Sequence, residues 1–289
     1  MAQSELWTIG SIIKWTEQYF GSKGVESPRL DAEVLLSYVL KKERIYLYVH
    51  FDEPLEPGEL AVFREMVKQR VLHVPVAYII GYREFMGLTF KVSPAVLVPR
   101  PDTEILVQAV LDRVKDKIAG AEIADIGTGS GAVVLSLLKY IPDLSAVTVD
   151  ISLAALAIAK ENSRLLEVDD RVAFYEGDVY APLAGQKLDV IVSNPPYIPD
   201  ADIAGLAPEV RDNEPHMALA GGRDGLDFYR RLVREGAPKL KNGGFLAFEV
   251  GIHQAKAVAA LAENEVLLGK TEIIKDYAGI ERVVIIWKA

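Results

Sequence analysis

The chain of 289 residues is half hydrophobic and one quarter charged, a composition typical of a soluble globular protein with one large domain or two. Cysteine is absent, which excludes disulfides and thiolate metal sites, and the net charge of −9 counts against a strong nucleic-acid binder, which usually carries a basic face. We recognise neither a secretory signal nor an apolar run long enough to span a membrane, so we expect a cytoplasmic protein.

Residues 1–82 predict a small helical domain. Apolar side chains recur at helical spacing between Leu6 and Phe20. A second amphipathic helix is expected after Ser27, a suitable N-cap, with Pro28 at its first position. A further helical pattern follows before the composition changes. Together these patterns indicate a helical bundle.

The spacing of hydrophobic residues then changes from helical to alternating. Hydrophobic residues alternate from Phe85 to Val92 around Gly87, which suits a tight turn. We therefore expect a β-hairpin connector over residues 83–98. Prolines then mark the passage into a second domain, residues 99–289.

Strand and helix patterns alternate through this second domain. Such alternation predicts right-handed crossovers and a parallel sheet with helices on both faces. The last two strand patterns are separated only by the letters DYAGIE, so they must form an antiparallel hairpin at one edge. The predicted fold is α/β: a mostly parallel, Rossmann-like sheet of seven strands, joined to the N-terminal helical bundle by the β-hairpin.

Polar or glycine residues end the first three strands of this sheet, where a doubly wound fold binds its ligand. The first strand ends in Asp-Ile-Gly-Thr-Gly-Ser-Gly, residues 125–131, whose glycines let the backbone pass closely under a ligand before a helix begins. Asp150 ends the second strand and is placed to accept hydrogen bonds from ribose hydroxyls. Asp178 ends the third, where a carboxylate can bind an adenine amino group. Three such features predict a nucleoside cofactor.

The glycine spacing indicates which cofactor this is. A dinucleotide fingerprint has the spacing G-x-G-x-x-G, whereas this chain has G-x-G-x-G with Asp125 two residues before it. An acidic residue there suits an amino group better than a pyrophosphate. S-adenosylmethionine has an amino-acid end, a ribose and an adenine, and no phosphate. A nicotinamide-dependent dehydrogenase, the alternative, is disfavoured by this spacing.

The fourth strand, residues 188–193, leads into Asn194-Pro195-Pro196-Tyr197 at the same edge of the sheet. The Asn194 side-chain oxygen and the Pro195 carbonyl can each accept one N–H of an –NH₂ group, and the Tyr197 ring can lie against that planar group. Two acceptors favour the positive charge that develops on the nitrogen during methyl transfer, and alignment contributes the rest. The motif predicts a planar –NH₂ acceptor without a general base; a merely rigid strand exit is the structural alternative.

These motifs resemble a known family. The stretches DIGTGSGAVVLSL, VDIS, GD and SNPPY are similar to class I S-adenosylmethionine-dependent methyltransferases that act on planar amines. PRLDAEVLL, VPRPDTE and APEVRDNEPHMALAGGRDGLDFYRRL resemble the protein-(glutamine-N5) methyltransferases, above all the release factor glutamine methyltransferases. This second resemblance covers nearly the whole chain, whereas NPPY alone is shared with adenine-N6 DNA methyltransferases.

The resemblance implies a function. It implies methylation, by S-adenosylmethionine, of the side-chain N5 of the glutamine in the Gly-Gly-Gln motif of class 1 peptide chain release factors, a step linked to translation termination. S-adenosylhomocysteine would be the product, with no metal, no direct nucleic-acid contact, no membrane and a monomeric enzyme. The N-terminal domain would recognise the release factor. A ribosomal-protein glutamine methyltransferase and a nucleic-acid adenine-N6 methyltransferase remain alternatives.

The resemblance also implies roles for single residues. Catalytic roles fall to Asn194, Pro195 and Tyr197, and substrate binding to these three with Pro196, Arg100 and Glu104. Thr103 could also cover the active site, although a proline-rich linker with a helix cap at Asp102 or Thr103 is the alternative. Glu209, Glu214 and Pro215 would belong to a loop over the substrate, or to an ordinary polar loop. The expected cofactor-binding residues are Asp125, Gly127, Thr128, Gly129, Ser130, Gly131, Asp150, Asp178, Val179 and Asn194.

Overall fold

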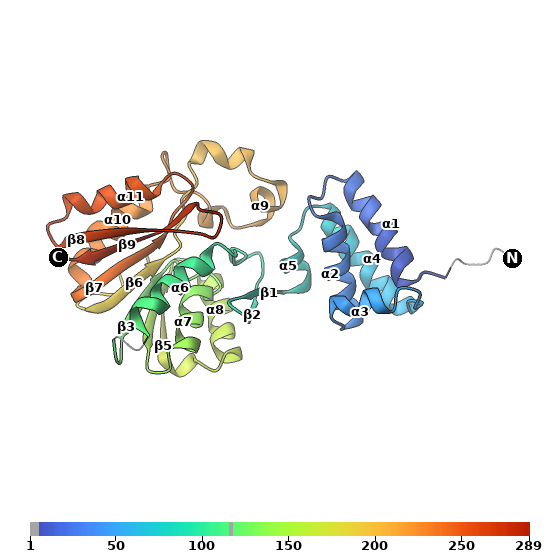
Figure 1. Ribbon diagram of the computed structural model, residues 1–289, viewed down its shortest axis with the longest axis horizontal. Helices are drawn as coiled ribbons and strands as arrows, with labels where there is room; N and C mark the ends of the chain where they lie inside the picture. Colours follow the sequence, from blue (N-terminus) through green and yellow to red (C-terminus); the bar gives the residue numbers. More distant parts are fainter. Residues whose placement is uncertain (1–5, 116–117) are drawn as a thin grey trace. The chain divides into compact units, whose positions relative to one another are not determined.

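A computed structural model describes residues 6–115 and 118–289, which form two compact units (Figure 1). The helical unit extends to Gly81 and also includes residues 207–213. The sheet unit comprises residues 82–206 and 214–289. Within the described residues, none of the helices combines the length and the apolar character needed to cross a membrane.

Helices alone build the helical unit, as the sequence predicts. The helices are α1 (Ile9–Ser22), α2 (Pro28–Leu40), α3 (Arg44–Val49), α4 (Pro57–Val71), α5 (Val76–Ile80) and α9 (Pro208–Asn213). Thr8 and Ser11 form a capping box at the start of α1, and Pro28 occupies the first turn of α2. Their apolar faces enclose a separate core that includes Phe20 and Phe63. The separate core explains why this part of the chain forms a unit of its own.

A buried ion-pair cluster joins α9 to this unit. The Arg70 guanidinium, 4% exposed, donates to Asp31 at 2.7 Å and to Glu209 at 2.6 Å. Asn213 adds a side-chain hydrogen bond to the His73 carbonyl, at 3.1 Å. A segment far along the chain therefore belongs to the N-terminal helices, which the sequence analysis did not anticipate.

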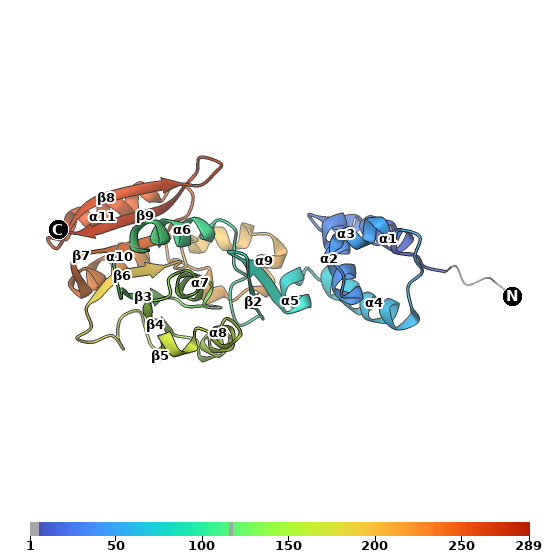
Figure 2. The ribbon, with the colours of Figure 1, turned by 60° about the horizontal axis from the view of Figure 1, so that its bottom comes forward.

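Seven strands form the central sheet in the order β5-β4-β3-β6-β7-β9-β8. Parallel pairing joins the first five, and β9 is antiparallel to both of its neighbours, so β8 and β9 form one edge (Figure 2). The predicted mixed sheet with an antiparallel edge hairpin is confirmed. The strands are β3 (Glu122–Ile126), β4 (Ser145–Asp150), β5 (Val172–Glu176), β6 (Leu188–Ser193), β7 (Leu240–Glu249), β8 (Leu268–Lys275) and β9 (Glu281–Lys288).

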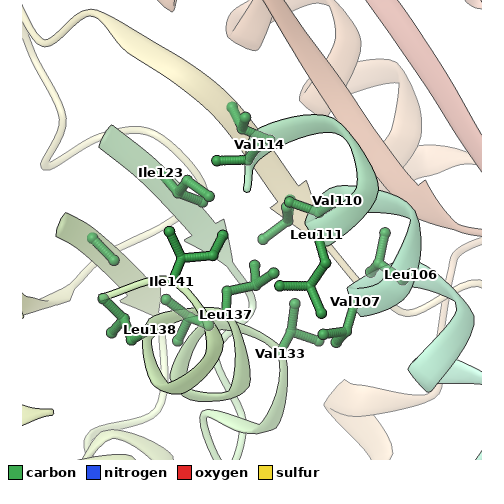
Figure 3. Close-up of a cluster of buried hydrophobic side chains, with 14 of the residues drawn as sticks. Leu106, Val107, Val110, Leu111, Val114, Ile123, Val133, Leu137, Leu138 and Ile141 are labelled. Atoms are coloured by element: carbon green, nitrogen blue, oxygen red, sulfur yellow. The ribbon is translucent and has the colours of Figure 1, made fainter. Parts of the chain in front are cut away.

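Helices cover both faces of the sheet. On one face, α6 (Thr103–Val114) packs on β7 and β9, and α7 (Ala132–Tyr140) packs on β3 and β6. Figure 3 shows aliphatic side chains of α6 and α7 packed against each other. Helix α8 (Leu153–Leu165) contacts β4 and β5. On the other face, α10 (Asp227–Gly236) and α11 (Ala255–Leu261) cover a second apolar cluster. Because each central strand is buried on both faces, its sequence is a continuous apolar run.

The predicted hairpin is present and packs within the sheet unit. Strands β1 (Tyr82–Phe85) and β2 (Leu88–Lys91) are joined by Met86 and Gly87, with φ of 50° and 67°. Two positive φ values are what a tight two-residue hairpin requires. Phe85 and Phe90 are buried in the same apolar cluster as α6 and α7. The boundaries at 83–98 for a separate connector stay a prediction.

Two boundaries lie at proline and glycine residues. Helix α10 ends at Gly236, before Pro238. Proline disfavours helix in the residue before it, which explains why the helix ends there. Strand β7 in turn begins at Leu240, before the Asn-Gly-Gly turn signal, and its register against β6 shifts near this point. The strand accommodates the glycines through an irregularity rather than a loop.

Candidate active site

A cavity of about 280 Å³ lies at the carboxyl ends of β3, β4, β5 and β6. Its walls come from the loops after these strands, from segment 95–103 and from α10, all parts of the sheet unit. The structure thus brings most of the predicted site residues to one cavity: Arg100, Asp125, Gly127, Thr128, Gly129, Ser130, Asp150, Asp178, Val179, Asn194, Pro195 and Pro196. The predicted residues that lie outside the described lining are Glu104, Gly131, Tyr197, Glu209 and Glu214.

Three glycines with positive φ form the floor of the cavity and the start of α7. At Gly127 and Gly129 an added Cβ would point into open space, so the absence of side chains leaves room for a ligand. Gly131 has another role: a Cβ there would lie 2.7 Å from Cδ1 of Leu135, which is too close. Gly131 therefore permits the helix to begin beneath the loop rather than lining the cavity itself.

Asn162 supports this loop, although no motif in the sequence singled it out. Its fully buried side-chain NH₂ donates to the Ser130 carbonyl at 2.8 Å and to the Lys91 carbonyl at 3.0 Å. Its oxygen accepts the Lys91 N–H at 2.7 Å. Because its side-chain NH₂ and oxygen are all paired, Asn162 connects α8 to β2 and to the glycine loop.

Asp125 is a buried carboxylate without a cationic neighbour among the described residues. It is 2% exposed, and burial together with the negative charge of Asp150 raises its pKa to about 7, although a backbone hydrogen bond from Val134 opposes the rise. A ligand ammonium group beside Asp125 would stabilise its ionised form. The environment therefore suits the amino-acid end of a cofactor.

Asp150 is held by the loop that it faces. Its two carboxylate oxygens accept backbone N–H groups from Gly129 at 2.9 Å and from Ser152 at 2.8 Å. These bonds fix the carboxylate at the cavity wall while each oxygen keeps a second lone pair. Hydroxyl groups of a ribose would find an oriented acceptor there.

Asp178 and Val179 line another part of the cavity. Arg231 of α10 donates to both Asp178 oxygens, at 2.9 Å each, so this carboxylate is already oriented by a bidentate partner. Val179 is buried with a φ of 52°, a strained conformation for a β-branched residue. The strain turns an apolar side chain toward a cavity that Phe228 and Leu232 also line.

The end of β6 is fixed in register beside β3. The Ser193 hydroxyl donates to the Ile126 carbonyl at 2.6 Å, which ties the end of β6 to the end of β3. Asn194 follows, and its side-chain NH₂ donates to the Thr103 hydroxyl oxygen at 3.1 Å. The Asn194 carbonyl oxygen Oδ1 has no assigned donor among the described residues, so it is available as an acceptor at the cavity.

Tyr197 and Glu104 have partners elsewhere. The Tyr197 hydroxyl donates to Oε1 of Glu249 at 3.4 Å, and burial raises the pKa of this phenol. Glu104 accepts the backbone N–H of Met86, at 2.7 Å, at the turn of the hairpin. Their predicted contact with substrate stays a prediction.

Thr103 and Glu249 are two buried polar residues that contact the Asn-Pro-Pro-Tyr motif. Thr103, at the start of α6, is 4% exposed and accepts from Asn194, and Glu249, at the end of β7, is 1% exposed and accepts from Tyr197. Burial, above all, raises the pKa of Glu249 to about 7, and the Asp102 charge adds to this, whereas Tyr197 and Arg282 oppose it. The only sequence signal was an acid that ends an apolar strand.

The loop after α9 contributes further residues to the cavity. Arg100 forms an ion pair with Glu214, whose side chain is 1% exposed. Pro215 and Met217 line the cavity beyond it. Glu209 instead pairs with Arg70 in the helical unit. The predicted substrate loop is therefore divided between the two units.

Comparison with known proteins adds to this geometry. Residues 11–81 match the family described as PrmC N-terminal domain, and residues 101–207 match the methyltransferase small domain. The release factor glutamine methyltransferase of Geobacter sulfurreducens is 46% identical over 257 residues, covering 89% of each chain. That of Moorella thermoacetica is 47% identical over 259 residues, covering 90% of this chain and 91% of the relative.

Solved structures share the fold at low identity. The catalytic domain of hMettl16 in complex with an RNA hairpin has a TM-score of 0.58 at 14% identity, covering 78% of this chain and 82% of that one. A methyltransferase from Pyrococcus furiosus has a TM-score of 0.52 at 19% identity, covering 71% of this chain and 90% of that one. At these identities the likeness concerns the fold alone.

Proposed function

The chain belongs to the release factor glutamine methyltransferase family, whose members are S-adenosylmethionine-dependent, and from this premise we propose how its cavity performs the reaction. The acceptor is the side-chain N5 of the glutamine in the Gly-Gly-Gln motif of a class 1 release factor. The observation that carries the proposal is the Asn194 amide, whose NH₂ is bonded to Thr103 while its oxygen stays free at the cavity.

The residues of the cavity fit S-adenosylmethionine. Asp125 offers an unpaired carboxylate to an ammonium group, and Asp150 offers oriented oxygens to ribose hydroxyls. Val179 gives adenine an apolar wall, and Asp178 can accept from its amino group. When bound, the cofactor supplies a methyl group on a positively charged sulfur and leaves as S-adenosylhomocysteine. We assign no metal to the site.

The chain's own groups position the acceptor nitrogen. Asn194 Oδ1 and the Pro195 carbonyl each accept one N–H of the glutamine amide, which orients the face of the nitrogen toward the methyl group. An amide nitrogen is a weak nucleophile because its lone pair is delocalised. Two fixed acceptor dipoles stabilise the positive charge that develops on this nitrogen, and they need no reorganisation during transfer. As the methyl–sulfur bond breaks and the methyl–nitrogen bond forms, the nitrogen becomes cationic, and it then loses one of its two N–H protons to solvent.

The remaining assignments concern partners and location. The helical unit, with its own core, recognises the body of the release factor, while Arg100 and Pro196 contact the segment around the glutamine. The protein works as a monomer, in the cytoplasm, without direct contact to nucleic acid. A net charge of −9 supports the last point, and the absence of cysteine fits a reducing compartment.

Methyl transfer to a purified class 1 release factor tests the proposal. With labelled S-adenosylmethionine, peptide mapping should find the label on the glutamine of Gly-Gly-Gln. Label found only in a ribosomal protein, or only in nucleic acid, would contradict it.

Asn194→Ala should lower kcat by about 10²-fold, on the scale of one lost transition-state contact, with cofactor affinity retained. Asn264→Ala, at an exposed asparagine in the same unit, is the matched control.

A further inference from the structure

The backbone carbonyl of Tyr197, the last residue of the Asn-Pro-Pro-Tyr motif, accepts a hydrogen bond from a side chain outside the cavity lining. The donor is Nε2 of Gln254, a half-buried residue at the start of α11, at 2.9 Å. Oε1 of Gln254 accepts the backbone N–H of Gly251 at 3.0 Å. Because a carbonyl only accepts and a backbone N–H only donates, these two bonds fix which end of the Gln254 amide faces the motif.

Three buried glycines leave the space that this contact occupies. A Cβ at Gly225 would lie 2.3 Å from the Tyr197 oxygen and 2.5 Å from Nε2 of Gln254. A Cβ at Gly221 would lie 2.7 Å from Cα of Tyr197. A Cβ at Gly251 would lie 2.6 Å from Oε1 of Gln254. Each of these distances is too short for two non-bonded atoms, so a side chain at any of the three positions would displace the motif or Gln254.

The two prolines of the motif make it stiff but provide no hydrogen bond to hold it. A proline has no N–H, and a residue before a proline is restricted to extended conformations, so Pro195 and Pro196 move as one unit. At one end of this unit, the Asn194 side chain is bonded to the start of α6. At the other end, Gln254 holds the carbonyl of Tyr197. The direction of the Pro195 carbonyl therefore depends on both attachments.

Gln254 also connects the motif to the loop before α10. Its Nε2 atom lies 3.5 Å from the carbonyl oxygen of Gly225 in that loop. The same loop binds the residue after the motif, because Ile198 accepts the Gly221 N–H at 2.8 Å. His253, which precedes Gln254, has a φ of 71°, a strained conformation for a residue other than glycine. Strain of this kind persists where the surrounding contacts require it, often at functional sites.

We propose that Gln254 is a positioning residue for methyl transfer, which holds the Tyr197 carbonyl and thereby fixes the Pro195 carbonyl at the substrate nitrogen. This inference rests on the proposed role of the Pro195 carbonyl as an acceptor. Gln254 touches neither substrate nor cofactor in this scheme. Its amide keeps the second acceptor of the site oriented before the substrate arrives, as the bond to α6 does for Asn194.

Two substitutions at Gln254 distinguish positioning from mere capping of α11. Gln254→Glu keeps an oxygen for the Gly251 N–H, but its carboxylate, ionised at about pH 8, cannot donate to Tyr197. Gln254→Met loses both bonds. We expect kcat with a purified release factor to fall about tenfold or more in both variants, because the acceptor is misaligned. KM for the release factor and the affinity for S-adenosylmethionine should stay within about threefold. A capping role predicts instead a normal kcat in Gln254→Glu and a loss only in Gln254→Met.

A spectroscopic measurement on the unliganded protein is independent of activity. The ¹³C signal of the Tyr197 carbonyl should shift in Gln254→Glu and in Gln254→Met, because this carbonyl loses its donor. Gln108→Met is the matched control, since it removes an exposed hydrogen bond to Asp112 within α6, 2.7 Å long. It should change neither that signal nor kcat by more than about twofold. An unchanged Tyr197 signal in both Gln254 variants would overturn the proposal.

The outcomes separate this inference from the proposed function. A normal kcat in Asn194→Ala would refute the proposed acceptor site and this inference with it. Loss of activity in Asn194→Ala together with a normal kcat in Gln254→Glu would overturn only the positioning role.

A pair of glycine variants keeps the test open if the Gln254 variants do not fold. Gly225→Ala and Gly279→Ala are both strained, at φ of 74° and 81°, but only the Cβ at position 225 would meet the Tyr197 carbonyl. A loss of kcat confined to Gly225→Ala is expected, by about tenfold or more. Equal kcat in the two variants contradicts the proposal.

Discussion

At the scale of single residues, two buried carboxyl groups, Asp125 in the lining of the cavity and Glu249 outside it, each have a pKa raised to about 7, chiefly by burial. The negative charge of Asp150 adds to the rise for Asp125, and that of Asp102 adds to the rise for Glu249. A carboxylate in such a place lowers the stability of the folded chain at neutral pH. A ligand ammonium group beside Asp125 would offset this cost.

Cofactor binding should depend on pH through Asp125. Below pH 7 the carboxyl group is increasingly protonated and loses its attraction for an ammonium group. We expect the affinity for S-adenosylmethionine, measured by calorimetry, to fall several-fold between pH 7.5 and pH 6, approaching tenfold per unit at lower pH. Asp125→Asn should bind more weakly at pH 7.5 and lose most of this dependence. An equal pH dependence in the variant would assign the titration to another group.

Stability should depend on pH through Glu249, because burial raises the pKa of its carboxyl group in the folded chain. Its pKa is 4.5 in the unfolded chain and about 7 in the folded one, so the folded state binds more protons between these values. The free energy of unfolding must then fall as pH rises through this window. Glu249→Gln has no such group, and it should exceed the wild type in stability at pH 8 by on the order of 2–3 kcal/mol, but match it near pH 4.5. Thermal unfolding at the two pH values checks this difference; a variant that is less stable at pH 8 contradicts it.

At the scale of elements, glycine residues have two different functions in the loop between β3 and α7. Gly127 and Gly129 keep the floor of the cavity open, whereas Gly131 lets Leu135 pack at the start of the helix. Asn162 then fixes the loop from below through Ser130. Backbone conformation, rather than side-chain chemistry, is what suits this element to the proposed cofactor site.

A matched pair of glycine variants tests this view. Gly127→Ala and Gly120→Ala each place a Cβ at positive φ, 80° and 61°, in open space. Both should destabilise the fold by about 1 kcal/mol because alanine is strained there. Only Gly127→Ala should weaken S-adenosylmethionine binding, by about tenfold or more, since Gly120 lies in the turn before β3, away from the cavity lining. Equal binding in the two variants would show that the ligand does not lie over Gly127.

At the scale of the whole molecule, the chain forms two units with separate cores. The cavity is lined by the sheet unit alone, whereas the helical unit has its own buried polar cluster around Arg70. Segment 207–213 belongs to the helical unit although both of its flanks belong to the sheet unit. If the helical unit recognises the release factor, as we propose, mutations there should affect substrate recognition without affecting cofactor binding.

Arg70→Leu should separate them. It leaves the Asp31 carboxyl group buried without its guanidinium partner and removes the pair with Glu209, which should destabilise the helical unit by about 3–5 kcal/mol. We expect KM for the release factor to rise while the Kd for S-adenosylmethionine is unchanged. Lys68→Ala, which removes an exposed pair with Glu65, should change stability by less than about 1 kcal/mol. A parallel loss of cofactor affinity in Arg70→Leu would contradict the division of work.

The sequence by itself determined the layers of the sheet unit and the composition of its ligand edge. Residues 125–131, Asp150 and Asn194 each follow an apolar strand, and parallel strands place their carboxyl ends at one edge. The antiparallel hairpin at the end of the chain was predictable from the length of its loop, because a short loop permits only antiparallel pairing. Local periodicity and connection length were sufficient for these conclusions.

Only the tertiary structure decided which side chains meet behind that edge. Thr103 meets Asn194, and Tyr197 meets Glu249, although these residues come from a helix start, a loop and a strand end that are far apart in the sequence. Neither Thr103 nor Glu249 has a local signature, because an acid after an apolar strand and a threonine at a helix start are also common at ordinary surfaces. These contacts depend on the order of the strands and on the packing of α6 across β7 and β9, which are long-range consequences of core packing. Side-chain hydrogen bonds of this kind become visible only once that packing is known.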